Sequence, residues 1–299
     1  MVTQWGERFF RIGNRRLVLR MPTPPKLDHT VINVGYQMDA AEPVFKGLGF
    51  HLTDRGYHSL GSINHLMMFG TDYLELIGLP ASAKGTISGR PDVQNAPIGI
   101  NGLVFKSDDV DETYAHLQSI GMAAEPPKSF GRPVELDGVT SQAKFRTVTV
   151  AVDAFPGGRV YFCEHLTPEL VWRPEWQTHA NGATSISEFT IVSTNPDQEA
   201  ENIANLLHSQ VDGEGERLNV PFDGGKITLL SPEAYKTRYG ALASPMGQRT
   251  SIFGAMTIQS NDLSAVRAIA KEAALPTLDK ANNINIRVPE FDSVLEFVS

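Results

Sequence analysis

One histidine and one glutamate stand in segments that have the pattern of buried strands. His29 lies within the alternating segment 27–34, and Glu75 lies between Leu74 and Leu76. A carboxylate among apolar neighbours is costly unless it is paired, hydrogen-bonded or bound to a metal. An imidazole nitrogen with a carboxylate oxygen suits Zn, Mn, Fe, Ni or Co. These two side chains are the first candidates for a metal site; a hydrogen-bonded buried histidine and a solvent-facing glutamate are the structural alternatives.

Four further polar residues on strand-like segments are candidates for substrate contacts. Asn64 either orients a substrate or caps a turn, and His65 either lines a cavity or faces solvent. Arg146 is a candidate anion contact and Tyr161 a candidate hydroxyl contact, although each also fits an ordinary strand position. The single cysteine, Cys163, lies in an apolar strand, where burial raises the pKa of a thiol, so we expect it only to pack.

These residues belong to a repeated succession of one strand, one helix and shorter strands. The first unit has a strand at 27–34, a helix at 38–48 ending at Gly49, and strands at 50–53, 64–69 and 73–77. The second has a strand at 98–105, a helix at 109–120, and strands at 145–150 and 159–164. The third has strands at 187–192 and 226–230 with a helix at 198–208 between them. The fourth has a strand at 253–258, a helix at 263–275, and strands at 283–288 and 294–298. The pattern predicts an α+β fold of four βαβββ modules.

The chain divides between the second and third units. We predict an extension outside the fold at 1–25, a first domain at 26–168, a connecting strap at 169–184 and a second domain at 185–299. Because indole rings are rarely left in water, Trp172 and Trp176 predict that the strap packs across a surface. Residues 1–20 hold five arginines and one acid. That composition is typical of a transit peptide, or the natural start is Met21.

The strand around His29, followed by Tyr73-Leu74-Glu75-Leu76, resembles the first module of the vicinal oxygen chelate superfamily, and in particular the glyoxalase-like domain proteins. The resemblance extends from Leu27 to about Trp176 and includes the segments 61–64 and 164–168. It implies that paired βαβββ modules curl into two half-barrel domains, of the kind found in glyoxalases and extradiol dioxygenases. It also implies a divalent metal (Fe, Mn, Zn, Ni or Co) held by the first and last strands of each module.

Transferred residue by residue, the resemblance makes His29 and Glu75 the ligands of the first module. In the second module the first-strand position falls near Gly102, which has no side chain for coordination. The last-strand position falls at Glu164 after a two-residue slip from Phe162, which keeps the same strand face. The expected metal ligands are therefore His29, Glu75 and Glu164, and the two glutamates are the expected proton-transferring groups.

The other histidines matter for the choice of chemistry. An extradiol dioxygenase would need a second histidine, which is missing unless His65 or His165 turns inward. Since His165 follows Glu164 directly, the two should point to opposite faces of a strand. In the second half of the chain the corresponding positions are Glu188, Thr228, Gly254 and Glu296, with no histidine among them. We expect this half to be a degenerate copy that lids or buttresses the first.

Composition excludes several classes of function. The 299 residues carry 34 acidic and 26 basic side chains, a formal charge of −8, which argues against nucleic acid or a membrane surface as partner. No apolar run is long enough to span a bilayer. Dinucleotide, phosphate-loop, nucleophile-elbow and zinc-protease motifs do not occur. With a single cysteine, an intramolecular disulfide is impossible, and we expect a cytoplasmic protein.

These observations lead to one main expectation and one rival. The main expectation is a metal-dependent enzyme for a small molecule with two adjacent oxygens, of the lyase or isomerase type ahead of a ring-cleaving dioxygenase. The rival is a non-catalytic binding protein of the same fold that has lost its metal, which Gly102 favours. A small-molecule substrate and a homodimer are the expected partners.

Overall fold

The computed structural model describes residues 8–12, 15–19, 23–136 and 138–299. Two eight-stranded mixed sheets form its body, and β1 (Arg8–Ile12) pairs with β2 (Arg15–Leu19) in a separate two-stranded sheet. The transit-peptide and early-start interpretations concern a segment of which residues 1–7, 13–14 and 20–22 lie outside the described chain. Within the described ranges, no helix is long and apolar enough to cross a membrane.

Two βαβββ modules build the first sheet. The first module comprises β3 (Leu27–Gly35), α1 (Met38–Gly47), β4 (Gly56–Tyr57), β5 (Ile63–Met68) and β6 (Tyr73–Gly78). The second comprises β7 (Gly99–Lys106), α3 (Val110–Ser119), β8 (Lys128–Leu136), β9 (Val139–Thr149) and β10 (Arg159–His165). Between the modules lie the short helices η1 (Ala81–Ala83) and α2 (Pro91–Gln94), and η2 (Val152–Ala154) precedes β10.

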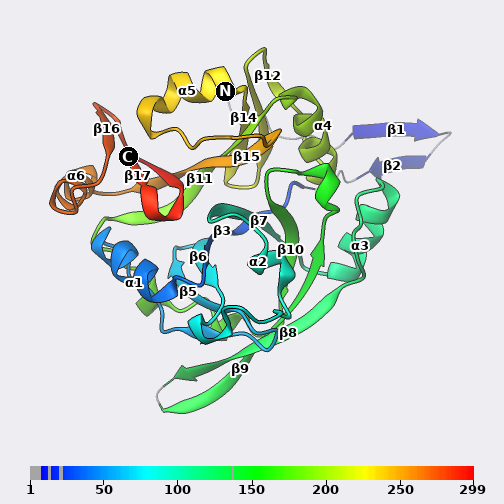
Figure 1. Ribbon diagram of the computed structural model, residues 1–299. Helices are drawn as coiled ribbons and strands as arrows, with labels where there is room; N and C mark the ends of the chain where they lie inside the picture. The colour runs from blue at the N-terminus through cyan, green and yellow to red at the C-terminus, as the bar shows by residue number, and fades with distance from the viewer. Residues whose placement is uncertain (1–7, 13–14, 20–22, 137) are drawn as a thin grey trace.

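The first sheet curls until its edges meet. Its order is β4-β5-β6-β3-β7-β10-β9-β8, with β3 and β7 antiparallel at the centre. The backbone amide of Ser59, beside β4, donates to the carbonyl oxygen of Gly131 in β8 at 2.9 Å, which links the two ends of the sheet. The strands consequently surround a cavity, and α2 is drawn within their ring in Figure 1.

The second sheet repeats this topology. Its third module comprises β11 (Ala183–Ser193), α4 (Pro196–Leu206), β12 (Asp212–Glu214), β13 (Arg217–Phe222) and β14 (Gly225–Leu230). The fourth comprises β15 (Ser251–Ser260), α6 (Leu263–Glu272), β16 (Thr277–Lys280), β17 (Asn283–Val288) and β18 (Ser293–Val298), with η6 (Pro289–Phe291) before β18. The connector holds α5 (Pro232–Tyr239) and η5 (Gly240–Leu242). The prediction of four βαβββ modules in two half-barrels is therefore confirmed.

The helices follow from local sequence. In α1 the side chains of Met38, Ala41 and Phe45 form the buried stripe, and Gly49 ends the helical segment with φ +81°, a conformation that glycine adopts without strain. At α3 the Asp109 carboxylate accepts from the backbone amides of residues 111 and 112, satisfying donors that the first turn leaves free. In α6 Asp262 does the same for residue 265.

One continuous apolar core joins the two halves. Phe50 packs against Phe297 with ring centroids 6.1 Å apart, and Phe105 packs against Phe222 at 5.9 Å. The strap carries η3 (Pro168–Leu170) and η4 (Pro174–Trp176), and its Trp172 ring packs edge-on against Tyr73. The second half thus packs against the helix-bearing face of the first sheet, where the shared core lies. The opposite face of the first sheet lines the cavity.

Candidate active site in the first sheet

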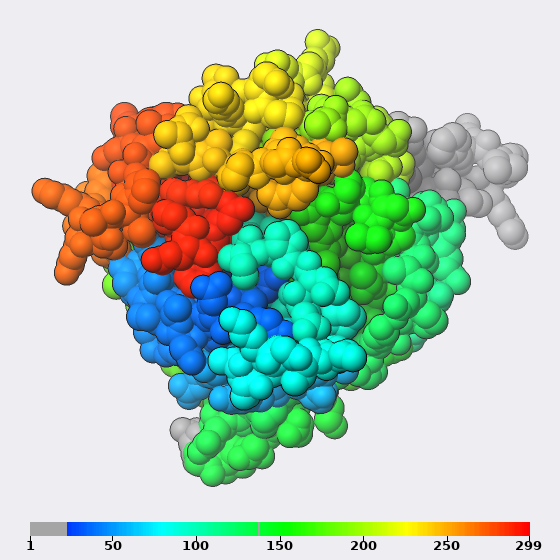
Figure 2. Space-filling model, viewed as in Figure 1, coloured from blue at the N-terminus to red at the C-terminus, as the bar shows by residue number. Residues whose placement is uncertain are grey.

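The hollow of the first sheet is a cavity of about 470 Å³, a size common for small-molecule sites. Residues 89–92 line it on one side; they belong to the α2 segment, the connector 79–98 that carries α2. Figure 2 shows this cyan segment lying over the blue first module. The segment is fastened to β3 by Asn33, whose amide nitrogen lies 3.1–3.2 Å from the carbonyl oxygens of Val93, Ala96 and Pro97. The described lining residues all belong to the first half of the chain, between positions 29 and 171.

At the centre of the cavity, His29 meets Glu75 and Tyr161. His29 Nε2 lies 3.1 Å from Tyr161 Oη and 3.5 Å from Glu75 Oε2. The Glu75 carboxylate also accepts a 2.7 Å hydrogen bond from Asn64 Nδ2. The structure therefore brings His29 and Glu75 together, as expected, and gives Asn64 the task of holding the glutamate. Burial raises the pKa of Tyr161, and Glu75 raises it further, so the phenol keeps its proton.

His29 is held in place from its other side. Its ring stacks on Tyr73 with centroids 4.4 Å apart, and its Nδ1 lies 3.6 Å from Asp28 Oδ2. Neighbours on a strand normally face opposite ways, but β3 bulges between Leu27 and His29, where Asp28 is the extra residue. Asp28 is fully buried and bonds to His165 Nε2 at 2.7 Å. Burial opposes its ionisation, but His165 and His29 lower the pKa of Asp28 below its usual value.

Glu164 does not join this group. In β10 the side chains of Tyr161 and Cys163 line the cavity, so the alternate residues Phe162 and Glu164 face the helix-bearing side. The Glu164 carboxylate accepts from the Val110 amide at the start of α3, 3.3 Å away. The expected set of three ligands, His29, Glu75 and Glu164, is therefore corrected. Glu164 lies on the same strand face as Phe162, and that face points away from the cavity. His165 does point away from Glu164, as expected, and toward Asp28.

Two of the expected substrate contacts also lie elsewhere. Arg146 pairs with Asp111 at 2.9 Å on the outer side of the sheet. His65 faces α1, where its Nδ1 lies 2.8 Å from the Thr53 carbonyl oxygen and its Nε2 accepts from Arg55. Neither lines the cavity. The alternation within β5 places Asn64 inward and therefore His65 outward, which the sequence left open.

The approximate symmetry between the modules explains which ligand positions are empty. In β3 and β6, Val31 pairs with Glu75, and in β7 and β10, Val104 pairs with Tyr161. Glu75 and Tyr161 therefore occupy equivalent positions, and Gly102 is equivalent to His29. A Cβ at Gly102 would lie 2.6 Å from Val31 Cγ2, so no larger residue fits there without displacing Val31.

The donors at the cavity centre do not supply the ligand set that the family resemblance implies. Of its four positions, only those of His29 and Glu75 carry an imidazole or carboxylate, whereas a catalytic zinc site usually has three protein ligands. Tyr161 stands at the fourth position as a protonated phenol that hydrogen-bonds the same His29 nitrogen. The residues at the cavity centre therefore do not fit a catalytic metal.

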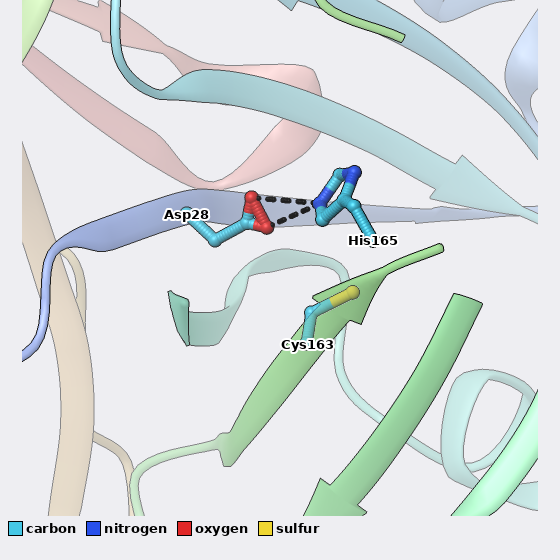
Figure 3. A group of neighbouring side chains, drawn as sticks. All are labelled: Asp28, Cys163 and His165. Atoms are coloured by element: carbon cyan, nitrogen blue, oxygen red, sulfur yellow. Dashed lines mark hydrogen bonds and ion pairs between the residues drawn. The ribbon is translucent and has the colours of Figure 1, made fainter. Parts of the chain in front are cut away.

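A second donor group lies beside the first. Figure 3 shows Asp28, Cys163 and His165 facing one another, and their donor atoms all lie within 4.8 Å of each other. In the described part of the chain, His165 Nδ1 is buried without a hydrogen-bond partner. Thiolate, imidazole and carboxylate are ligands that zinc accepts. Without a metal, burial raises the pKa of Cys163 above its usual value, so the thiol stays protonated.

Four cationic side chains that sequence reasoning missed also line the cavity: Arg90, Lys128, Arg132 and Arg159. Arg90 and Arg159 both pair with Asp92, at 2.7 Å and 2.6 Å. Burial opposes ionisation of Asp92, but the two arginines lower its pKa to about 2. Burial also lowers the pKa of the lining His58 to about 4, so this histidine is neutral at pH 7.

The comparisons with known proteins agree with this architecture. The chain resembles a hypothetical protein from Staphylococcus aureus with 14% identity and a TM-score of 0.64, over 91% of this chain and 98% of that one. It resembles a mutant of 4-hydroxymandelate synthase from Streptomyces coelicolor with 14% identity and a TM-score of 0.56, over 93% of both chains. A xylose isomerase-like TIM barrel/4-hydroxyphenylpyruvate dioxygenase fusion protein matches with 14% identity and a TM-score of 0.57, over 96% of this chain and 51% of that one.

At these identities the solved structures establish the fold alone. No curated protein matches the chain. The model of the glyoxalase-like domain family matches residues 27–207, which is more than half of the sequence and includes the whole first sheet. The resemblance inferred from the strands of His29 and Glu75 is thereby confirmed, and the protein belongs to the glyoxalase-like domain family.

Proposed function

We propose that the protein is an enzyme that moves a proton on a small oxygenated molecule bound in the cavity of the first sheet, with His29 as the acid or base. The observation that carries the proposal is the placement of His29 between Asp28 and the pair Glu75 and Tyr161. Histidine is the most frequent proton-transferring side chain, and its task requires a fixed ring with one nitrogen open to the substrate.

Each neighbour has a definite part in this chemistry. With the ring proton on Nδ1, toward Asp28, the lone pair of His29 Nε2 lies beside the Tyr161 hydroxyl in the cavity. When a bound substrate draws the Tyr161 hydroxyl to its oxygen, this lone pair becomes free to take a proton from carbon. Glu75, 3.5 Å from Nε2, stabilises the imidazolium that results. Tyr161 then donates its hydrogen bond to the oxygen on which negative charge develops. These roles suit an isomerase or lyase that abstracts a proton next to a carbonyl group.

The proposal is tested by exchange of carbon-bound hydrogen. We expect the wild-type protein in D₂O to replace hydrogens next to the carbonyl of hydroxyacetone or pyruvate by deuterium, which proton NMR follows directly. His29→Gln should slow this exchange by roughly 10²–10⁴-fold, the usual contribution of a general base. Glu164→Gln is the matched control, because Glu164 faces α3, and should leave the rate unchanged. Equal rates in wild type and His29→Gln would refute the role of His29.

A non-catalytic binding protein is the rival function. Gly102 favours it, because the position equivalent to His29 has room for no side chain. The same NMR samples separate the two: a ligand whose signals broaden or shift on binding, without any deuterium uptake across a panel of oxo and hydroxy compounds, supports the rival.

A metal-dependent enzyme is the second candidate, favoured by the group Asp28, Cys163 and His165. A bound metal there would supply Lewis acidity next to the cavity. Elemental mass spectrometry on protein purified without a His-tag or chelator decides the matter. Metal lost in Cys163→Ser but kept in Glu75→Gln supports this group; metal lost in Glu75→Gln but kept in Cys163→Ser supports the cavity centre instead.

A further inference from the structure

Arg132 is a buried cation without an ion-pair partner in the part of the chain that the structure describes. It projects from β8 into the cavity and is 5% exposed, and its Nη2 has no hydrogen-bond partner within the described chain. No carboxylate of the described residues lies within 4.0 Å of its guanidinium, since none of the ion pairs includes it. A buried charge is costly unless it is paired, so a negatively charged group beside Arg132 is missing.

The other cations that line the cavity each contact a carboxylate. Arg90 and Arg159 share Asp92, and Lys128 pairs with Glu125. The remaining lining acid, Glu75, accepts from Asn64, and no ion pair within 4.0 Å joins it to Arg132. Arg159, although paired, also has a buried Nη2 without a partner among the residues described. Two guanidinium groups therefore present free N–H donors to the same cavity.

We propose that Arg132 binds an anionic oxygen group of the substrate, a carboxylate or a phosphate, and so makes the protein specific for small oxyanions. The inference rests on the proposed function, since it concerns the same cavity as His29. A guanidinium presents planar, fork-like donors that match two oxygens of one carboxylate or phosphate. The ligand would replace water around Arg132 and supply the missing negative charge.

The first experiment measures binding of oxalate and inorganic phosphate by isothermal titration calorimetry, with the uncharged isostere oxamide as ligand control. We expect wild type to bind at least one of the two anions and not oxamide. Arg132→Gln should weaken that binding by roughly 10–100-fold, as expected for lost hydrogen bonds to a charged group. Arg132→Lys, which keeps the charge but not the fork, should lie between them. Arg146→Gln is the matched control, since Arg146 pairs on the outer side of the sheet.

Several outcomes decide the proposal. Tighter oxalate binding assigns a carboxylate substrate and tighter phosphate binding a phosphorylated one. Equal binding in wild type and Arg132→Gln, binding of neither anion, or equal affinity for oxamide overturns the inference. If Arg132→Gln fails to fold, oxalate-induced thermal stabilisation of wild type against Arg132→Lys provides the same comparison.

Failure of this inference differs from failure of the proposed function. If pyruvate and the neutral hydroxyacetone exchange hydrogen equally well in wild type and Arg132→Gln, His29 chemistry stands and the anion site falls. If anions bind through Arg132 but no compound exchanges, the anion site stands and the catalytic proposal falls.

Discussion

The two sheets share one topology but treat their inward-facing charges in opposite ways. In the second sheet, Arg238 of α5 lies 2.5 Å from Glu188 and 2.7 Å from Glu296, and Tyr239 donates to Glu296 at 3.0 Å. In the first sheet, the equivalent region holds a cavity, and Arg132 has no such partner within the described chain. One sheet satisfies its charges within the protein, whereas the other leaves donors for a ligand.

The connector between modules accounts for the difference. In the second sheet it forms α5, whose Tyr235 and Tyr239 are buried against the sheet, and a Cβ at Gly254 would lie 2.9 Å from the Tyr235 ring. In the first sheet the connector forms the three-residue η1 and the four-residue α2, which cover the hollow without filling it. In this protein the segment between the two modules of a sheet therefore contributes to how far the inner face of that sheet is filled.

The largest expected effect comes from removing the central arginine of each sheet. Arg238→Met leaves buried Glu296 without a charged partner and buried Glu188 with only the partly exposed Lys226, and should lower the free energy of unfolding by about 3–5 kcal/mol. Arg132→Met removes a cation that has no ion-pair partner among the described residues and should cost nothing or stabilise the protein. Urea unfolding of both variants tests this. Equal losses of stability in the two variants would contradict the difference between the sheets. Lys226→Met is the control: Lys226 also pairs with Glu188 but is partly exposed, so its loss should cost under about 1 kcal/mol.

A second effect concerns Asp72, which links the sheets by accepting from the Ile186 amide of β11 at 2.9 Å. Burial raises the pKa of Asp72 to about 6, so the folded state holds the proton more tightly than the unfolded state. Its contribution to stability is therefore fully present below pH 4 and is lost as the pH rises toward 6.

Asp72→Asn keeps an acceptor and removes the titration. Above pH 6 it should be more stable than wild type by roughly 3 kcal/mol, in line with a shift of about two pKa units, and the gain should vanish near pH 3. Thermal unfolding between pH 3 and 8 measures the difference. A constant difference across that range would mean that Asp72 does not titrate between the sheets as inferred.

The smallest effect is expected at the emptied ligand position. Gly102→Ala forces a Cβ against Val31, for which overpacking costs about 1–3 kcal/mol, partly offset by a gain of about 0.4–1 kcal/mol in the unfolded state. We expect a net loss of roughly 1–2 kcal/mol in chemical denaturation. Gly47→Ala, with open space around its Cβ, is the control and should be neutral or stabilising. If Gly102→Ala leaves the stability unchanged, Val31 moves aside, and the position can accommodate a metal-ligating side chain.

The sequence predicted what depends on local alternation and failed where two elements meet. The strands with an apolar pattern and the four modules follow from period-two patterns and from a repeated order of elements, whereas the meeting of His29 with Glu75 was implied by the family resemblance. Asp28 was overlooked because a bulge, which has no sequence signal here, turns it to the same side as His29. Glu164 was misplaced because alternation fixes which residues share a face but not which face points inward.

Arg132 was beyond sequence reasoning for another reason. It lies on β8, which the apolar pattern did not reveal because this strand has no apolar run and its buried residues, Arg132 and Val134, are separated by an exposed proline. Its entry into the cavity depends on the closure of the sheet between Ser59 and Gly131, which joins residues far apart in the chain. Charge balance in the cavity became visible only once these edges were brought together.

The attachment of the α2 segment by Asn33 bears on which molecules can enter. One amide group has two hydrogens, yet three carbonyl oxygens lie within bonding distance of it. One acceptor is therefore always in reserve, so a small shift of the segment need not leave either hydrogen without an acceptor. Such a shift would change the size of the cavity while its cover stays attached to β3.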